Sequence, residues 1–367
     1  MRVIPLRHNL DHAAGGPPRH EIAALYPELC ARYGVNPHGI TCYAEEARRA
    51  LIAAEEELLA ALHIRSSEAF VLWCATGTEA LNLALRGAYN TSNCNAVIYD
   101  KSSHPALVKT AQSLPDSRPF TLDNKGHALL PDGLPHGPCL VALPLVNNES
   151  GARWDGDRDA LPPDALLVAD GCQALGKEEI PWEEARLDLI AISGRKIGGP
   201  SAAALVCRRG IPLKPLLTGG GQQQGLRAGT VDVVAAVMLA RAATLTVREQ
   251  AAARARAAAL KAQLLQGLRP EWPLFSAEGA SPFITLFAIP GYDGAVAARI
   301  LAQEYGILVG TGSACAAEHG DPSPTLSALR VPEEIARGAL RVSFGPESVS
   351  DNVEAFLSAL PQVLANW

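Results

Sequence analysis

The chain has 367 residues, 48% of them hydrophobic, and carries a formal net charge of −6 with a pI near 5.9. A chain of this length can bury a large core and is expected to divide into two domains. The negative charge argues against nucleic acid or an anionic membrane as the main partner. The N-terminus lacks the apolar stretch of a signal peptide, and no apolar run approaches the roughly 18 residues of a membrane-spanning helix.

The chain alternates helix-like and strand-like segments. Residues 21–34 and 43–63 are predicted to be helices, the second with leucine and alanine at three- and four-residue spacing. Short runs that are apolar at every position follow at residues 69–74, 96–100, 139–145, 165–170, 187–193 and 203–208. Strands of this kind are covered on both faces, so the pattern predicts a mostly parallel sheet in an α/β layer fold.

The sequence changes character in its last third. An alanine-rich segment from about residue 231 to 268 predicts one long helix. The tail then predicts a smaller α+β domain, with strands at 282–290 and 339–345, a helix at 294–306 and a closing helix from Ser350. We therefore expect a large domain at residues 17–240. Residues 1–16 and 241–367 are expected to form the small domain, including the loop near 310–322.

The eight cysteines are scattered and form no C-x-x-C pair. This spacing fits neither a zinc site nor a disulfide framework, so we expect no metal and a reduced, cytoplasmic protein. Cys315 differs from the other cysteines because it lies among small and polar residues, in "GTGSACAAEHGDP". Such exposure suits a reactive thiol, although a lone loop cysteine is usually inert. Seven are expected to be packing residues: Cys30, Cys42, Cys74, Cys94, Cys139, Cys172 and Cys207.

Polar clusters lie at the carboxyl ends of the expected strands, where ligands bind in open α/β sheets. Gly77 and Thr78 open a helix, which indicates either a phosphate site or an ordinary threonine N-cap. Asp170 ends a very apolar strand, where an unpaired carboxylate is costly. It therefore needs a protonated ligand nitrogen, or it is a helix cap or a buried ion pair with an arginine. Lys196, one of only seven lysines, follows the next strand. It is either an amine that binds an aldehyde cofactor or part of a solvated loop.

Asp170 and Lys196, 26 residues apart, together form the arrangement that pyridoxal phosphate chemistry requires. The lysine holds the cofactor aldehyde as an imine and moves protons at the substrate α-carbon. The carboxylate keeps the ring nitrogen protonated, and the helix N-terminus holds the phosphate.

The sequence resembles the cysteine desulfurases of the NifS/IscS kind, within the class V aminotransferases of pyridoxal phosphate fold type I. The resemblance covers nearly the whole chain and follows the family order of motifs. These include "NLDHAAGG", "ATGTEALNLAL", "SSHPAL", "VNNESG", "VADGCQALGK", "SGRKIGGP", "GGGQQQGLRAGT", "GTGSACA" and "LRVSFG". It implies a large domain with a mostly parallel sheet and a smaller α+β C-terminal domain.

The resemblance also implies roles at the cofactor. Lys196 falls on the lysine that binds the cofactor, Asp170 on the partner of the pyridine nitrogen, and Gln173 on the residue that hydrogen-bonds the ring hydroxyl. His104 matches the imidazole that stacks on the ring, or it simply caps a helix before Pro105. The phosphate is expected to contact Gly77, Thr78, Ser193, Arg195 and, from the partner subunit of a homodimer, Thr230.

Further roles concern the substrate and the sulfur. Asn36, Asn148 and Arg341 match residues near the substrate, with Asn148 also near the cofactor and Arg341 as the carboxylate clamp. The alternative interpretations are that Arg341 is a surface residue of a strand and that Asn148 forms only the hydrogen bonds of a turn. Cys315 matches the thiol that takes up sulfur as a persulfide. Beyond it, Glu318 and His319 either tune that thiol or are solvated loop residues.

Two departures from the family pattern stand out. Arg195 replaces a histidine that usually precedes the lysine; arginine can hold a phosphate but cannot shuttle a proton. The segment between Asn36 and Ala44 is short, and in the family it helps to line the substrate entrance. The substrate is therefore less firmly predicted than the cofactor.

The sequence thus predicts a pyridoxal phosphate-dependent cysteine desulfurase that converts L-cysteine to L-alanine and leaves sulfur on Cys315, with Lys196 and His104 also catalytic. One alternative is another class V enzyme, a lyase or aminotransferase acting on a different amino acid, with Cys315 incidental. A second is a paralogue that binds cofactor or a partner protein without turnover. The expected partners are a second copy of the chain and a sulfur-acceptor protein in iron–sulfur cluster assembly.

Overall fold

The computed structural model describes residues 6–91, 93–123, 126–132, 137–311 and 323–365. Its centre is an eight-stranded sheet with the order β2-β9-β8-β7-β6-β3-β4-β5. Strands β4, β3, β6, β7 and β8 pair in parallel, whereas β9 is antiparallel to β2 and β8, and β5 is antiparallel to β4. The expectation of a mostly parallel sheet is therefore confirmed. The strands are β2 (Ala69–Cys74), β3 (Ala96–Asp100), β4 (Ser117–Leu122), β5 (Ala128–Leu129), β6 (Cys139–Pro144), β7 (Leu166–Asp170), β8 (Leu189–Ser193) and β9 (Ala203–Arg208).

Both faces of the sheet are covered, because successive residues of a strand point to opposite sides. In β6, Val141 and Leu143 join one hydrophobic cluster, while Leu140 and Ala142 join another. Strands with two buried faces are apolar at every position, which is why six of them could be predicted. Strands β4 and β5 were not predicted, since they are partly exposed and β4 contains a proline.

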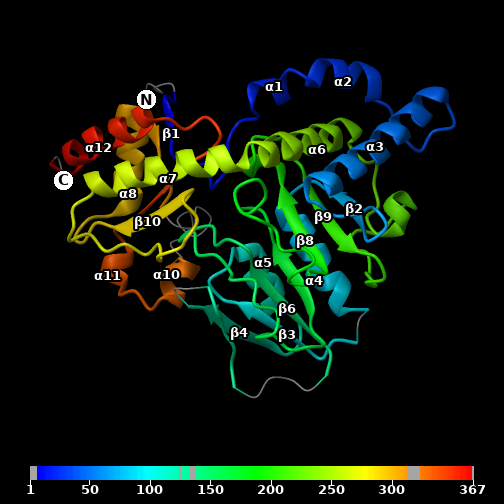
Figure 1. Cartoon of the computed structure of the whole chain (residues 1–367), viewed down its shortest axis with the longest axis horizontal. Coiled ribbons are helices and arrows are strands. Elements are labelled where there is room, and N and C mark those ends of the chain that lie inside the picture. The colour runs from blue at the N-terminus through cyan, green and yellow to red at the C-terminus, as the bar shows by residue number, and fades with distance from the viewer. Residues whose placement is uncertain (1–5, 92, 124–125, 133–136, 312–322, 366–367) are drawn as a thin grey trace.

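Helices form the outer layers (Figure 1). Residues of α3 and α6 belong to the first of these clusters, and residues of α4 and α5 belong to the second. Each pair therefore covers one face of the sheet. The four helices are α3 (Cys42–Ala61), α6 (Val233–Arg248), α4 (Gly77–Tyr89) and α5 (Pro105–Gln112).

Two expected helices are each divided into two. The alanine-rich segment forms α6 and α7 (Gln250–Gly267), separated at Glu249, whose backbone departs from helical geometry with ψ −1°. The segment expected at 21–34 forms α1 (His20–Ala23) and α2 (Tyr26–Tyr33). Pro27 lies in the first turn of α2, where its missing N–H removes no hydrogen bond of that helix. A proline cannot continue a preceding helix, so α1 ends before it.

The C-terminal part of the chain has its own two-stranded antiparallel sheet of β10 (Ile284–Ala288) and β12 (Ala339–Ser343). The N-terminal segment crosses to this part, because β1 (His8–Asn9) pairs with β11 (Ile307–Leu308) and Asp11 bridges to Ser343. Figure 1 shows β1 beside the C-terminal helices, away from the large sheet. The remaining helical elements here are α8 (Gly294–Ile300), η3 (Leu301–Tyr305), α10 (Pro324–Ala328), α11 (Glu333–Ala336) and α12 (Ser350–Ala365).

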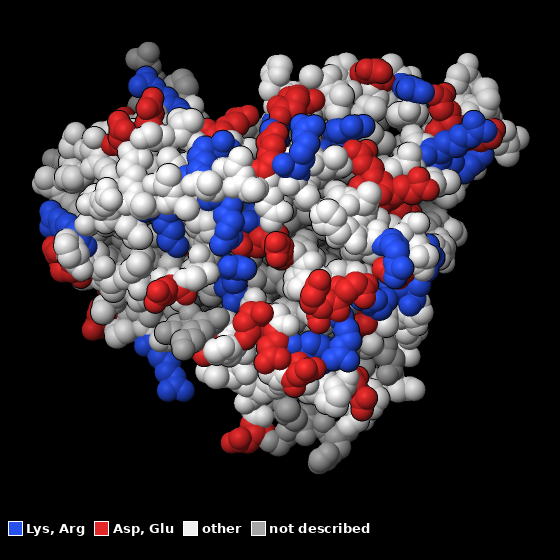
Figure 2. Space-filling model, in the orientation of Figure 1, with Lys and Arg blue, Asp and Glu red and all other residues white. Residues whose placement is uncertain are grey.

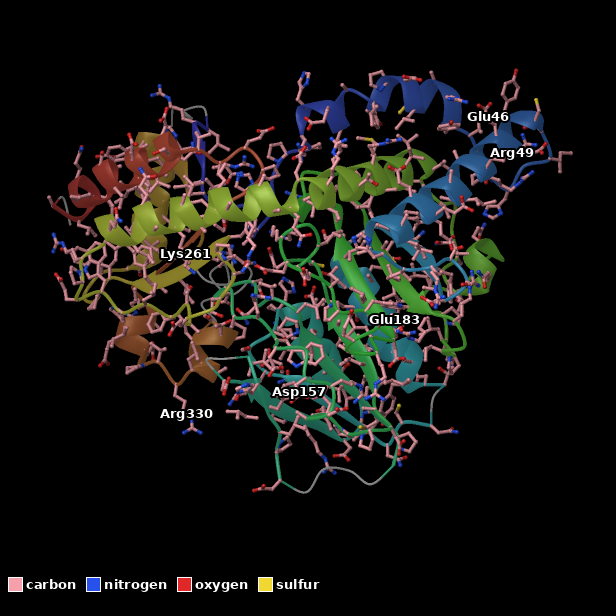
Figure 3. All side chains as sticks on the ribbon, in the orientation of Figure 1. Glu46, Arg49, Asp157, Glu183, Lys261 and Arg330 are labelled. Atoms are coloured by element: carbon pink, nitrogen blue, oxygen red, sulfur yellow. The ribbon has the colours of Figure 1, made fainter. Side chains whose placement is uncertain are left out.

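Charges of both signs are intermixed over the visible face of the molecule (Figure 2). Some of these charges tie elements together: Glu46, in the first half of α3 (Figure 3), forms an ion pair of 2.7 Å with Arg32 of α2. Among the helices that the structure describes, none combines the length and apolarity needed to cross a membrane.

Candidate active site

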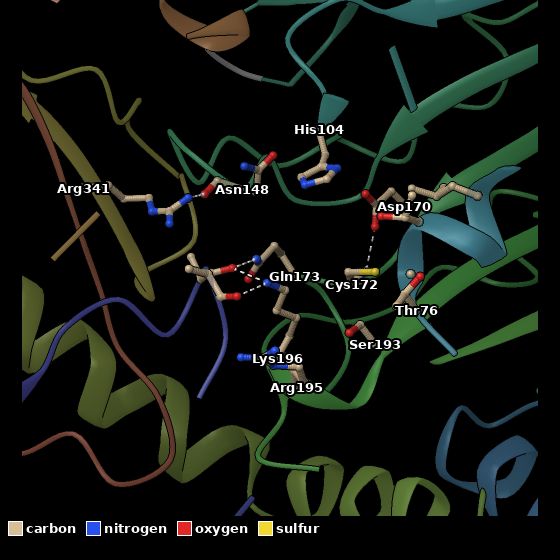
Figure 4. A pocket seen from close by; sticks show the side chains of 15 residues that line it. Thr76, His104, Asn148, Asp170, Cys172, Gln173, Ser193, Arg195, Lys196 and Arg341 are labelled. Atoms are coloured by element: carbon tan, nitrogen blue, oxygen red, sulfur yellow. Dashed lines mark hydrogen bonds between the residues drawn. The ribbon is translucent and has the colours of Figure 1, made fainter. Parts of the chain in front are cut away.

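A cavity of about 270 Å³ lies at the carboxyl ends of β7 and β8 (Figure 4). Asp170 ends β7 and Ser193 ends β8, and Lys196 closes the short 3-10 helix η1 (Gly194–Lys196) that follows. Because β7 and β8 are parallel neighbours, their ends meet at one edge of the sheet. Ten of the residues predicted from the sequence line this cavity: Gly77, Thr78, His104, Asn148, Asp170, Gln173, Ser193, Arg195, Lys196 and Arg341.

The N-terminus of α4 forms one wall of the cavity and suits an anion. Thr76, not Thr78, is the N-cap, and its hydroxyl accepts a hydrogen bond of 3.1 Å from the Glu79 backbone N–H. The first N–H groups of a helix have no partner within the helix, so those of Gly77 and Thr78 are available to a ligand. A Cβ added at Gly77 would lie 3.0 Å from the Cys172 sulfur, which explains why glycine stands here.

Asp170 presents a buried carboxylate to the cavity. It is 8% exposed, and its Oδ1 accepts a hydrogen bond of 3.0 Å from the Cys172 backbone N–H. Within the described part of the chain no lysine or arginine forms an ion pair with it, so the arginine-pair interpretation is wrong. A buried carboxylate without a cation calls for one in the cavity.

His104 and Lys196 are the titratable bases of the cavity. The Nδ1 of His104 accepts a hydrogen bond of 3.1 Å from the Ala106 N–H, so the side chain caps α5 and lines the cavity at once. Burial is the main cause that lowers the pKa of His104. Burial also lowers the pKa of Lys196, whose Nζ donates to the carbonyls of Ala13 and Ala14 at 2.8 and 2.7 Å. Both shifts favour the neutral base.

Arg341 reaches the cavity from β12 and is only 2% exposed. Its Nη2 lies 2.7 Å from the carboxylate of Asp11, and its Nη1 donates to the Asn148 carbonyl at 2.7 Å. The buried Nε has no hydrogen-bond partner among the described residues. Arg341 is therefore held in place by two contacts, and Nη1 and Nη2 each carry a second N–H that a carboxylate clamp can use. It is not a surface residue.

Two other predicted residues do not line this cavity, and a third lies outside the residues that the structure describes. Asn36 is exposed, and its Oδ1 accepts a hydrogen bond of 3.0 Å from the His38 N–H. Thr230 is exposed, and the role expected for it lies at a partner subunit. Cys315 falls outside the described residues, as do its neighbours Glu318 and His319.

Several residues that line the cavity are not predicted from the sequence. Ala13 and Ala14 supply backbone carbonyls, which no side-chain pattern reveals. Thr76 was detectable, because a threonine followed three residues later by a glutamate marks a helix start. Cys172 is predicted to be a packing residue, yet it lines the cavity between Asp170 and the start of α4.

The arrangement fits a flat ligand that has an anionic group, a protonated ring nitrogen and a carbonyl carbon within reach of an amine. No group of histidine, cysteine and carboxylate side chains that could hold a metal ion is found among the described residues. The carboxylate of Asp170, the amine of Lys196 and the guanidinium of Arg341 suit an organic cofactor and an amino-acid-like carboxylate.

The chain belongs to the aminotransferase class-V family, which matches residues 8–356. It is 31% identical to an IscS-like cysteine desulfurase of Mycobacterium tuberculosis, over 97% of this chain and 96% of that protein. It is 28% identical to a cysteine desulfurase IscS of Clostridium botulinum, over 93% of this chain and 89% of that protein. A solved NifS-like protein superposes with a TM-score of 0.88 at 23% identity, covering 98% of this chain and 100% of that chain. The family and fold predictions are therefore confirmed.

Proposed function

We propose that this chain is a pyridoxal phosphate-dependent cysteine desulfurase, which releases L-alanine from L-cysteine and takes up the sulfur as a persulfide on Cys315. The observation that carries the proposal is one cavity that joins an amine, an unpaired buried carboxylate and a buried guanidinium. The similarity to cysteine desulfurases over nearly the full length of the chain favours this activity over a class V lyase or aminotransferase.

The cofactor-binding roles follow from the contacts that each group can make. The N–H groups of Gly77 and Thr78 would hold the phosphate, with Ser193 and the guanidinium of Arg195 beside them. The free carboxylate oxygen of Asp170 would keep the ring nitrogen protonated. When bound, pyridoxal phosphate supplies an electron-withdrawing ring that stabilises negative charge at the substrate α-carbon.

The remaining residues act on the substrate. Arg341 would bind the α-carboxylate through the second N–H groups of Nη1 and Nη2, with Asn148 at the same wall. Lys196, which burial makes easier to deprotonate, would remove and return a proton at the α-carbon. His104 covers the cofactor position as a neutral imidazole, because burial disfavours its cation.

We further infer a homodimer in which Thr230 reaches the cofactor of the partner subunit, and a cytoplasmic enzyme that passes sulfur to an acceptor protein in iron–sulfur cluster assembly. Asn36 is proposed to line the substrate entrance. The division into residues 17–240 and residues 1–16 with 241–367 stays a prediction, and its boundary falls within α6.

The test is to supply L-cysteine and a reductant to the purified protein loaded with pyridoxal phosphate. Alanine and sulfide should appear in equal amounts. A class V lyase or aminotransferase would not release alanine and sulfide in equal amounts.

A further inference from the structure

Lys177 is a buried lysine directly behind the proposed cofactor site. It is 4% exposed and does not line the cavity. Its Nζ donates to Oε1 of Gln173 at 2.9 Å and lies 5.9 Å from the centre of the Phe283 ring. In the part of the chain that the structure describes, no carboxylate forms an ion pair with it. Nothing in the proposed reaction uses this side chain.

The local backbone brings Lys177 to Gln173. Residues 172–177 form successive turns, in which the Lys177 N–H donates to the Ala174 carbonyl at 2.9 Å. Gly176, between the two residues, has a left-handed backbone with φ 68°, and the turns bring the Lys177 amine to the side chain of Gln173. The lysine therefore stands against the amide of Gln173.

Two contacts agree on the orientation of the Gln173 amide. A lysine ammonium can only donate, so it must face the amide oxygen. A backbone carbonyl can only accept, and the carbonyl of Ala13 takes a hydrogen bond of 2.8 Å from Nε2 of Gln173. In the opposite orientation, the amide N–H groups would face the Lys177 ammonium, and the amide oxygen would face the carbonyl oxygen of Ala13. The amide thus keeps one N–H on Ala13 and has a second N–H for the cavity that Gln173 lines.

Burying this charge is costly, which argues that Lys177 does more than fill space. Burial lowers the pKa of Lys177 to about 7; the positive charges of Lys196 and Arg341 add to the shift, and Cys172 and Glu178 oppose it. An apolar side chain of similar length would fill the same volume without this cost. What the amine provides is the hydrogen bond to Gln173, which also polarises the amide.

We infer that Lys177 is a positioning residue, which fixes Gln173 so that its amide N–H faces the ring hydroxyl of bound pyridoxal phosphate. The inference rests on the proposed function, because it concerns that cofactor. An N–H at the ring oxygen stabilises negative charge there. That charge is greatest in the high-pH form of the bound cofactor, so loss of the N–H moves the spectral transition to higher pH.

The test is a double-mutant cycle on the holoenzyme with Lys177→Met, Gln173→Ala and the double variant. The readouts are the pH midpoint of the visible absorption band and the rate at which diluted holoenzyme loses cofactor. Each single variant should raise the midpoint by about half a pH unit or more and speed cofactor loss about fivefold, the effect of one hydrogen bond. The double variant should match Gln173→Ala, because Lys177 acts through that amide. A wild-type midpoint in Lys177→Met, or effects that add, would overturn the inference.

Gln173→Glu tests the same point with Lys177 in place. The carboxylate can accept from Lys177 but has no N–H to offer, so its midpoint should rise at least as far as that of Gln173→Ala. A wild-type midpoint in Gln173→Glu would also overturn the inference, even if Lys177→Met fails to fold. If the wild-type protein shows no visible band with pyridoxal phosphate, the proposed function itself fails.

Discussion

Asp11 and Arg341, 330 residues apart, form a buried ion pair with 2.7 Å between Oδ1 and Nη2. Gly310 packs directly on the pair, since a Cβ there would lie 2.8 Å from the Asp11 carboxylate. The N-terminal segment, the strand β12 and the first residue of the proposed sulfur-carrying loop therefore meet at one charge pair.

Asp11→Ala is expected to lower the free energy of unfolding by about 3–5 kcal/mol, because it leaves the Arg341 cation buried and unpaired. The same change should raise KM for cysteine, since Arg341 loses one of its two anchors. Asp11→Asn keeps an acceptor oxygen and should be milder in both respects. Urea unfolding followed by circular dichroism measures the loss, and an unchanged midpoint in Asp11→Ala would show that the pair contributes nothing.

Lys196 should carry the cofactor covalently. Purified protein should absorb at visible wavelengths, and borohydride should remove that band and fix the cofactor to Lys196, as peptide mapping would show. Lys177 is the matched control, because it is a buried lysine close to the cavity whose pKa is also lowered by burial. An adduct on Lys177 or Lys214 would mean that the site is assigned to the wrong lysine.

Arg195 should act as a phosphate ligand and not as a proton carrier. It is exposed and lines the cavity, and its guanidinium has no hydrogen bond or ion pair to the rest of the described chain, so its charge is free for a ligand. Arg195→Ala should weaken cofactor affinity by roughly ten- to a hundredfold, whereas Arg195→His should stay near wild type. Equilibrium dialysis measures this, and full cofactor retention by the alanine variant at limiting cofactor contradicts it.

His12 should make the protein less stable in mild acid. Its ring fills the space beside Gly345, and burial, aided by the charge of Lys177, lowers its pKa from 6.5 to about 4. Between these pH values the unfolded chain binds a proton that the folded chain does not, so stability falls as the pH drops. The loss through this window reaches about 3 kcal/mol at most.

Comparison of His12→Gln with wild type isolates this effect. The free energy of unfolding of the variant should depend less on pH between 6.5 and 4. If the difference between the two proteins stays constant across this range, His12 is not the group responsible.

How much of the fold can be predicted depends on which structural features leave a pattern of side chains in the sequence. Runs buried on both faces, such as Ala96–Asp100, are apolar up to their last residue, and the sequence predicts this strand with the bounds that the structure gives it. The break at Glu249 has no proline or glycine to signal it. Strand β4 was missed because it is partly exposed and lacks the continuous apolar pattern.

The same limit on prediction from sequence applies to the residues of the candidate active site. Residues at strand ends, such as Asp170, could be proposed because topology gathers those ends at one edge. The carbonyl of Ala13 lies 183 residues from Lys196, and a backbone group leaves no mark in the side-chain pattern. Asp11 escaped notice for a related reason, since only the crossing of the N-terminal segment brings it to Arg341.

The most direct measurement is product analysis of the holoenzyme with L-cysteine, a reductant and the Cys315→Ala variant as control. The wild-type protein should release alanine and sulfide in equal amounts. Cys315→Ala should keep the visible band of the cofactor, because Lys196 and the ring contacts are untouched, yet it should form no persulfide and almost no alanine. Alanine production at the wild-type rate by Cys315→Ala, or the absence of both products with wild-type protein, would contradict the proposed function.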